Sequence, residues 1–199
     1  MSALTSKIFS HSTLGLALLC TSLTASADWT LDNDASSLHY LTSKAGAITE
    51  LNSFTQLSGS IKGQGLAVLD ISLASVDTAI PVRDERMRNI LFKVTENPLA
   101  SVEVDVSGLE LKDSPEGTLL QEHLVAAFTM NGVTNSVETD FAIAVLSDGD
   151  LLITNRTPLV INAGAYGLAD GVEELREVAG LPSINNNAIV SFSLVYRQD

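Results

Sequence analysis

The sequence predicts an all-β domain of eight or more antiparallel strands with one or two short helices. Three observations support this prediction. Apolar residues recur at every second position over most of the chain, tight-turn sequences separate these alternating runs, and only two segments depart from the period of two. Such a domain is either a sandwich or a closed barrel, and the periodicity does not decide between them.

The alternation is clearest in three runs near the middle and end of the chain. In residues 101–106, 137–145 and 190–197, every second side chain is apolar except Thr139, as in a strand with one buried face. Other apolar runs predict further strands. They are Ser37 to Thr42, Glu50 to Thr55, Leu57 to Lys62, Leu66 to Leu73, Leu119 to Met130 and Leu151 to Ile161.

Glycine-containing turn sequences lie between these runs. Asn131-Gly132 is typical of a two-residue hairpin turn. Comparable sequences stand at residues 62–65, 114–117 and 147–150. Short connections of this kind predict that successive strands are antiparallel neighbours.

Two segments break the alternation. In Asp170 to Ala179 the apolar residues have helical spacing, and Asp170 and Glu173 form a capping-box pair. This segment predicts a short amphipathic helix. Pro81 to Leu91, which contains the run Arg83-Asp84-Glu85-Arg86-Met87-Arg88, predicts a second helical or irregular insertion.

The composition fits one globular domain and excludes one large class of function. The 199 residues are 45% apolar and 18% charged, and no repeat or linker divides the chain. Its 24 acidic and 11 basic residues give a formal net charge of −13. Because such a surface repels phosphate backbones, we expect no nucleic-acid binding.

The first 27 residues predict a cleavable secretory signal peptide. Lys7 precedes the apolar run Leu14 to Cys20, and the triplet Ala25-Ser26-Ala27 is typical of a cleavage site before Asp28. The mature domain, residues 28–199, then has no cysteine, which excludes disulfides and thiol catalysis. Lipid attachment at Cys20 is an alternative, but Leu19 is larger than the small residue that this modification requires.

The sequence contains no established catalytic or metal-binding motif. A nucleophile elbow, a zinc-protease helix, a phosphate-binding loop and a dinucleotide fingerprint are all missing from it. His39 and His123 are the histidines that follow the leader, and two isolated histidines make a weak metal site. We therefore predict no catalytic residue, no metal and no cofactor.

An ordered set of motifs resembles the YceI-like family. It opens with Trp29-Thr30-Leu31-Asp32, Ser37-Leu38-His39-Tyr40, Phe54 and Ser58-Gly59-Ser60-Ile61. It continues with Ile71 to Thr78, the Arg-Asp segment Arg83 to Arg88, Leu91-Phe92, Pro98 to Val104 and Phe128 to Thr134. The resemblance spans nearly all of Asp28 to Tyr196.

The resemblance implies an extended antiparallel lipocalin-like β-barrel in a secreted or periplasmic protein. The family is regarded as polyisoprenoid-binding rather than catalytic, so the implied partner is an isoprenoid or other long-chain lipid in an apolar lumen. A polyprenyl phosphate and an isoprenoid quinone are the two candidates. Release would need transient contact with a membrane, and the oligomeric state, including a homodimer, is left open.

The chain departs from the family pattern in two places. Ala165-Tyr166-Gly167-Leu168 stands where many relatives have an aromatic-glycine pair in a strand. The helical segment Asp170 to Ala179 is an addition before the last strand, and it is a candidate cover for one mouth of the barrel.

Bulky apolar residues and one arginine are the candidate ligand-binding residues. The expected lumen-lining residues are Phe54, Met87, Phe92, Phe128, Phe141, Tyr166 and Phe192. A filled core has the same sequence signature as a lined lumen. Arg83, in the cationic run, is the candidate donor to a phosphate or quinone head group. The alternative is a structural ion-pair network that holds this segment.

Three functions follow from these alternatives. The first is a non-enzymatic protein that transports or stores an isoprenoid lipid. The second is a lipid-modifying enzyme on the same barrel, which predicts His39 or His123 beside a carboxylate or hydroxyl inside the lumen. The third is a stress-response interaction module with a filled core, which predicts no cavity.

Overall fold

The computed structural model describes residues 28–62 and 65–199, and within them the alternating runs form eleven strands. The predicted leader, residues 1–27, lies outside the described residues, as do residues 63–64 of one predicted turn. The strands are β1 (Trp29–Lys44), β2 (Ile48–Phe54), β3 (Leu57–Ile61), β4 (Leu66–Ser72), β5 (Val76–Asp77), β6 (Leu99–Asp105), β7 (Leu119–Met130), β8 (Val133–Val145), β9 (Leu151–Asn155), β10 (Leu159–Asn162) and β11 (Asn187–Gln198).

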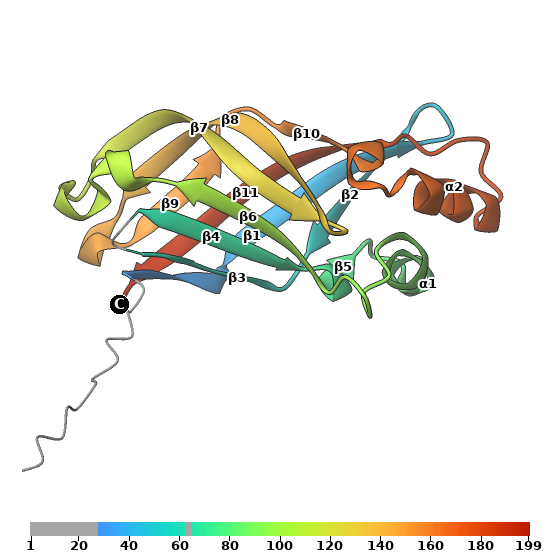
Figure 1. Ribbon diagram of the computed structural model, residues 1–199, viewed down its shortest axis with the longest axis horizontal. Coiled ribbons are helices and arrows are strands. Elements are labelled where there is room, and N and C mark those ends of the chain that lie inside the picture. The colour runs from blue at the N-terminus through green and yellow to red at the C-terminus, as the bar shows by residue number, and fades with distance from the viewer. Residues whose placement is uncertain (1–27, 63–64) are drawn as a thin grey trace, which may run out of the picture.

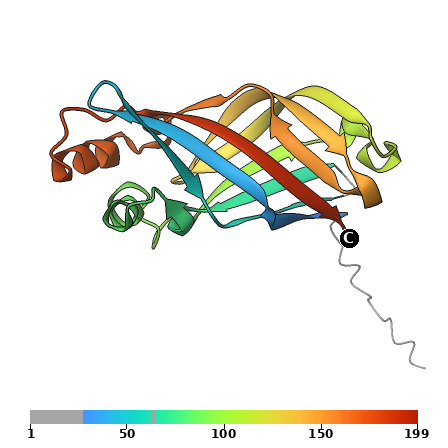
Figure 2. The same cartoon turned by 180° about the vertical axis from the view of Figure 1, so that it is seen from behind.

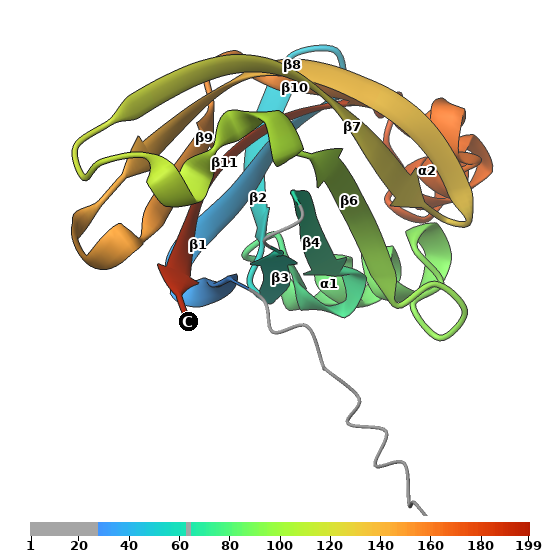
Figure 3. The same cartoon turned by 60° about the vertical axis from the view of Figure 1, so that its left-hand side comes forward.

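Eight of these strands close into an antiparallel barrel, which confirms the predicted all-β fold (Figure 1). Around the ring the order is β1, β3, β4, β6, β7, β8, β9 and β11, and β11 pairs with β1 to close it. Figure 3 turns one end of this ring toward the viewer. A barrel of about eight strands is wide enough for either a side-chain core or one small ligand.

The predicted strand from Leu151 to Ile161 is wrong as a single element. The structure divides it into β9 and β10, with residues 156–158 between them. Pro158 has no N–H to give to a ladder, so the chain leaves the sheet there. Both pieces pair with β11, one after the other along the same strand.

The prediction that successive strands are neighbours fails for β2 and β3. Both pair with the same edge of β1, one after the other, so they do not pair with each other.

Both predicted helical segments are helical. Helix α1 (Pro81–Arg86) begins at a proline, whose fixed φ suits the first turn, and continues as a π-helical turn, Met87–Leu91. Helix α2 (Ala169–Val178) occupies the second segment. None of the helices in the described residues is long and apolar enough to cross a membrane.

The predicted capping box of α2 is wrong. Leu168 occupies the N-cap without a side-chain hydrogen bond, and Asp170 lies inside the first turn, where a carboxylate still favours the helix dipole. Glu173 forms an ion pair with Arg176 at 2.7 Å. The helix ends before Gly180, which has a φ of 63°.

Both helices lie at the same end of the barrel, together with the turn between β1 and β2 (Figures 1 and 2). We call this the helical end. At the opposite end the barrel is filled by its own side chains. Trp29 is 2% exposed and donates from Nε1 to the Gly149 carbonyl at 2.8 Å. The buried Tyr196 hydroxyl donates to the Val68 carbonyl at 3.3 Å, and a Cβ on Gly59 would lie 2.4 Å from that oxygen.

Candidate ligand-binding cavity

The barrel encloses an apolar cavity of about 450 Å³. This volume lies within the range of about 300–1,000 Å³ that is usual for small-molecule sites. Inward-facing residues of β6, from Ala100 to Val104, and the following Val106 line it. At about 3.3 Å per residue these six steps span roughly 20 Å. The filled-core alternative predicts no such space, so the cavity contradicts that alternative.

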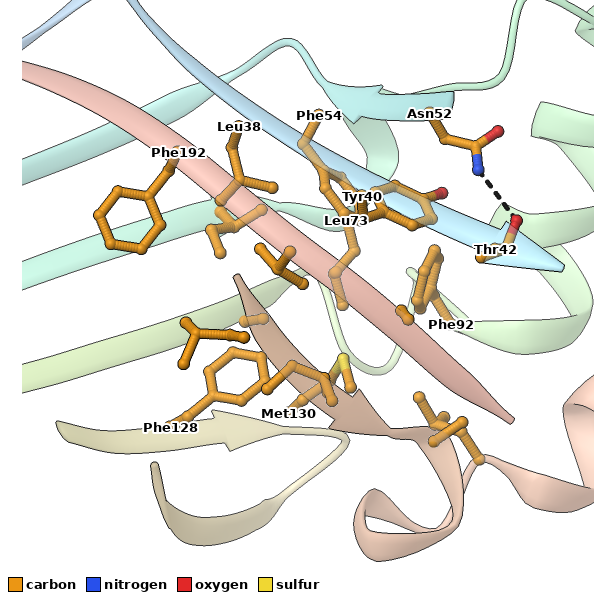
Figure 4. A pocket seen from close by; sticks show the side chains of 18 of the residues that line it. Leu38, Tyr40, Thr42, Asn52, Phe54, Leu73, Phe92, Phe128, Met130 and Phe192 are labelled. Carbon is orange, nitrogen blue, oxygen red and sulfur yellow. Dashed lines mark hydrogen bonds between the residues drawn. The ribbon is translucent and has the colours of Figure 1, made fainter. Parts of the chain in front are cut away.

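Six of the seven predicted lining residues do line the cavity, and Figure 4 labels four of them. They are Phe54, Met87, Phe92, Phe128, Phe141 and Phe192. Two aromatic pairs form much of the wall. The rings of Phe54 and Phe92 have centroids 5.9 Å apart, and the rings of Phe141 and Phe192 are separated by the same distance.

Tyr166 is the seventh predicted residue, and it is not among the residues that line this cavity. It is buried in the 3₁₀ turn Ala163–Tyr166 and packs edge-on against Phe128, with ring centroids 5.1 Å apart. Asn131 donates to its backbone carbonyl at 3.1 Å. Tyr166 therefore supports a lining residue from behind.

A polar group on β2 faces the cavity and was missed in the sequence. Asn52 is 5% exposed and donates from Nδ2 to Thr42 Oγ1 at 3.1 Å, as the dashed line in Figure 4 shows. The strand alternation contained the signal, because Asn52 is two residues before the inward-facing Phe54. The neighbouring Tyr40 lies with its hydroxyl 3.9 Å from Met87 Sδ, and burial raises the pKa of this phenol.

An ion-pair network lies at the helical end of the cavity. Glu50 accepts from Arg83 Nη1 and forms an ion pair with Lys44 Nζ at 2.8 Å. The guanidinium and the ammonium hold the pKa of Glu50 below its usual range. Arg83 also donates from Nη2 to the Thr78 carbonyl at 2.6 Å. The predicted structural network therefore exists, and its carboxylate is Glu50.

Arg83 nevertheless keeps one free donor. Its Nε is buried, and no partner for this atom lies among the described residues. Arg83 belongs to the cavity lining, but other protein atoms cover this Nε, so it does not face the space that a ligand would fill. A buried unpaired donor costs about 1–3 kcal/mol, so the hydrogen bonds of this side chain are incomplete.

Helix α2 forms part of the cavity wall, as expected for a segment that covers one mouth. Val172 and Leu175 of this helix line the cavity, and so does Ala179, its C-cap. The helix packs closely on the π-helical turn, because a Cβ on Gly171 would lie 3.2 Å from Leu91 Cα.

The two histidines of the described residues lie on the outer face of the barrel. His39 is exposed between two buried neighbours on β1. His123 is 61% exposed, and its Nδ1 lies 3.0 Å from Asp140, which raises its pKa. The enzyme alternative needs such a pair inside the lumen, and neither histidine lines it. Within residues 28–62 and 65–199, no cluster of histidine, cysteine and acidic side chains is suited to a metal ion.

A closed antiparallel barrel with one filled end and an apolar cavity is the architecture of the lipocalin-like, small-ligand-binding barrels. The chain belongs to the YceI-like domain family, whose model matches residues 29–196.

The solved structures similar to this chain include two that it covers almost completely. A polyisoprenoid binding domain from Saccharophagus degradans implicated in plant cell wall breakdown is 33% identical, with a TM-score of 0.85. The match covers 87% of this chain and 100% of that one. BcnA from Burkholderia cenocepacia is 17% identical, with a TM-score of 0.63 over 83% of this chain and 98% of that one, and it shows the fold alone. A comparison with curated proteins gave no match.

Proposed function

We propose that this protein is a periplasmic, non-enzymatic binding protein that holds an isoprenoid lipid in its barrel for transport or storage. The observation that carries the proposal is the apolar cavity of about 450 Å³, which is lined by aromatic and aliphatic side chains. Side chains close the barrel at the end opposite the helices. The 33% identity to a polyisoprenoid binding domain supports the choice of an isoprenoid chain. The predicted leader supports the periplasmic location.

The size of the cavity supports a useful affinity. A methylene group takes up about the volume of a water molecule, roughly 30 Å³. The volume of about 450 Å³ therefore holds about 15 such groups, or the carbon atoms of three isoprene units. At about 0.8 kcal/mol for each buried methylene, this chain gains roughly 12 kcal/mol before the cost of association.

The polar groups at the helical end support a head group placed there. Arg83 brings a guanidinium to the cavity lining, and Asn52 lies farther along the same wall. A polyprenyl phosphate or an isoprenoid quinone would place its oxygens at this end with its chain toward the filled end. Ile80 and Val82, which are exposed at the same end, support transient contact with a membrane during loading and release.

The test is the lipid content of the protein purified gently from its native periplasm. We expect extraction and mass spectrometry to recover one isoprenoid species in a fixed ratio to protein. Ala126→Phe places a ring in the cavity, whereas Ala127→Phe places the same ring on the outer face of the same strand. We expect the lipid to be lost from the first variant and kept in the second. Lipid-free wild-type protein, or recovery only from the cytoplasm, would contradict the proposal.

A further inference from the structure

The barrel wall is interrupted between β8 and β10. β8 pairs with β9 only between Phe141 and Val145, and β10 pairs only with β11. The last backbone bond across this seam runs from Arg156 N to the Asp140 carbonyl at 2.8 Å. Beyond it the edges formed by residues 133–139 and 159–162 face each other without a ladder among the described residues.

Side chains bridge the two ends of this interruption. Thr139 Oγ1 donates to the Thr157 carbonyl at 3.4 Å at one end. Asn135 Nδ2 donates to the Ala165 carbonyl at 3.0 Å at the other. We call the space between these bridges the β8–β10 slit, and its volume is about 380 Å³.

The slit lies in the wall of the barrel and borders the main cavity. Its lining includes four residues that also line the main cavity, and four neighbours that alternate with them. The shared residues are Val137, Thr139, Leu159 and Ile161, and the alternating ones are Ser136, Glu138, Val160 and Asn162. Successive residues of a strand point to opposite faces of the sheet. The slit and the cavity therefore share these four residues, at a place where no ladder joins the two described strands.

The chemistry of the slit differs from that of the cavity. Hydroxyl and amide side chains line it, and the two strand edges present backbone N–H and C=O groups without ladder partners. No lysine or arginine is present among its described lining residues, which include the acidic Glu138. The carboxylate of Glu138 lies 3.7 Å from His123 Nε2 on the outer face. This set suits an uncharged hydrogen-bonding group and disfavours a phosphate.

We infer that the β8–β10 slit is a second, lateral opening of the cavity and a subsite for an uncharged hydroxyl or carbonyl group. The molecule that carries this group would have its apolar part in the cavity, so the subsite rests on the proposed function. A ligand with a phosphate head would place that head at the helical end and leave the slit free.

Thiol accessibility tests the opening. Cys20 is the single cysteine of the sequence, so a Cys20→Ser background makes any introduced cysteine unique. Val137→Cys and Ala126→Cys are register partners that both line the cavity, but only the first borders the slit. We expect a hydrophilic methanethiosulfonate to label Val137→Cys several-fold faster. Ile161→Cys against its partner Ala188→Cys is a second matched pair, and equal rates in both pairs would overturn the opening.

Two probes with the same chain test the subsite. We expect bound geranylgeraniol to slow the labelling of Val137→Cys, and bound geranylgeranyl phosphate to slow it much less. If geranylgeraniol binds without protecting this cysteine, the subsite is wrong and the proposed function stands. If neither probe binds, the proposed function and the subsite fail, whereas fast labelling of Val137→Cys would still support the opening.

A charge reversal tests the preference for an uncharged group. Glu138→Lys places a cation at the slit, and we expect it to raise the protection given by the phosphate probe relative to the alcohol. Glu103→Lys makes the same change in net charge at an exposed site on β6 and is the control. An equal effect of both variants, or none from Glu138→Lys, would contradict the assignment.

Discussion

The most direct perturbation of the cavity is Ala126→Phe on β7. Ala126 is buried and lines the cavity, so its added ring enters space that a ligand would otherwise occupy. The six added ring carbons displace about as many ligand carbons, which at about 0.8 kcal/mol each is roughly 5 kcal/mol of lost burial. If the ligand slides toward the mouth and keeps half of this energy, the loss is about 2.5 kcal/mol. The expected rise in Kd is then about 50-fold to several thousand-fold.

The assay is titration of delipidated protein with geranylgeraniol, followed by the fluorescence of a polyene analogue in competition. Ala127→Phe is the control, because Ala127 is exposed on the opposite face of the same strand and should bind as the wild type does. Thermal melting separates loss of binding from loss of folding. A ring placed in empty space should leave the Tm of the delipidated protein nearly unchanged, whereas a ring forced into a packed core costs about 1–3 kcal/mol. Unchanged affinity in Ala126→Phe, or its global unfolding, would refute the existence of usable space at this position.

Three further predictions concern the helical end, the outer face and the filled end of the barrel. Arg83→Ala removes a charged donor worth about 1.5–3 kcal/mol, so retention of geranylgeranyl phosphate should fall about 10-fold or more. Tm should fall too, because the contacts with Glu50 and Thr78 are lost, but by less than retention falls. Arg88→Ala is the control, and equal retention would contradict the head-group role. The pKa of His123 is raised above its ordinary value of 6.5 by Asp140, so its stabilising contribution is full below that value and is lost as the pH rises through the folded pKa. An NMR titration should show the pKa returning toward 6.5 in Asp140→Asn, and an unchanged pKa would disprove the pairing. Gly59→Ala places a Cβ 2.4 Å from the Val68 carbonyl and should lower the unfolding free energy by about 1–3 kcal/mol, whereas Gly108→Ala, with nothing within 4 Å, should not; similar Tm values for both would rule out the close approach.

The sequence predicted the strands well because one face of each strand is buried. A period of two follows from the pleat, so inward positions such as Phe128 and Phe141 could be chosen from the alternation alone. The choice between barrel and sandwich depends on whether β11 meets β1, and this pairing joins Trp29 to Gln198. Nothing in local periodicity reports such a contact, so the resemblance to a known family had to supply it.

The errors in the candidate site have the same origin. Tyr166 has the composition of a lining residue, but it lies in a turn outside the strands, where the period of two does not determine direction. The alternation predicted a continuous strand from Leu151 to Ile161, and a single proline divided it. Asn52 was missed because an amide on an inward position looks like a solvent-facing residue until its partner Thr42 is placed beside it.

The slit was beyond prediction for a further reason. The slit exists because β10 pairs with β11, whereas the described chain makes no backbone hydrogen bond to β8 after Arg156. The two strands diverge there because they run in different directions. Local sequence specifies whether a segment is extended, but it carries little information about which of two edges the segment will follow.

The pairing of β1 with β11 ties the beginning of the folded domain to its last strand, and Thr30 Oγ1 donates to the Asp199 carboxylate at 2.9 Å. Contacts between residues so distant along the chain form late and slowly during folding. Until the final strand has been synthesised and docked, there is no enclosed space for a guest molecule. A guest could therefore be enclosed only after β11 has been synthesised, and a hydrophobic guest present when β11 docks on β1 would favour that last step.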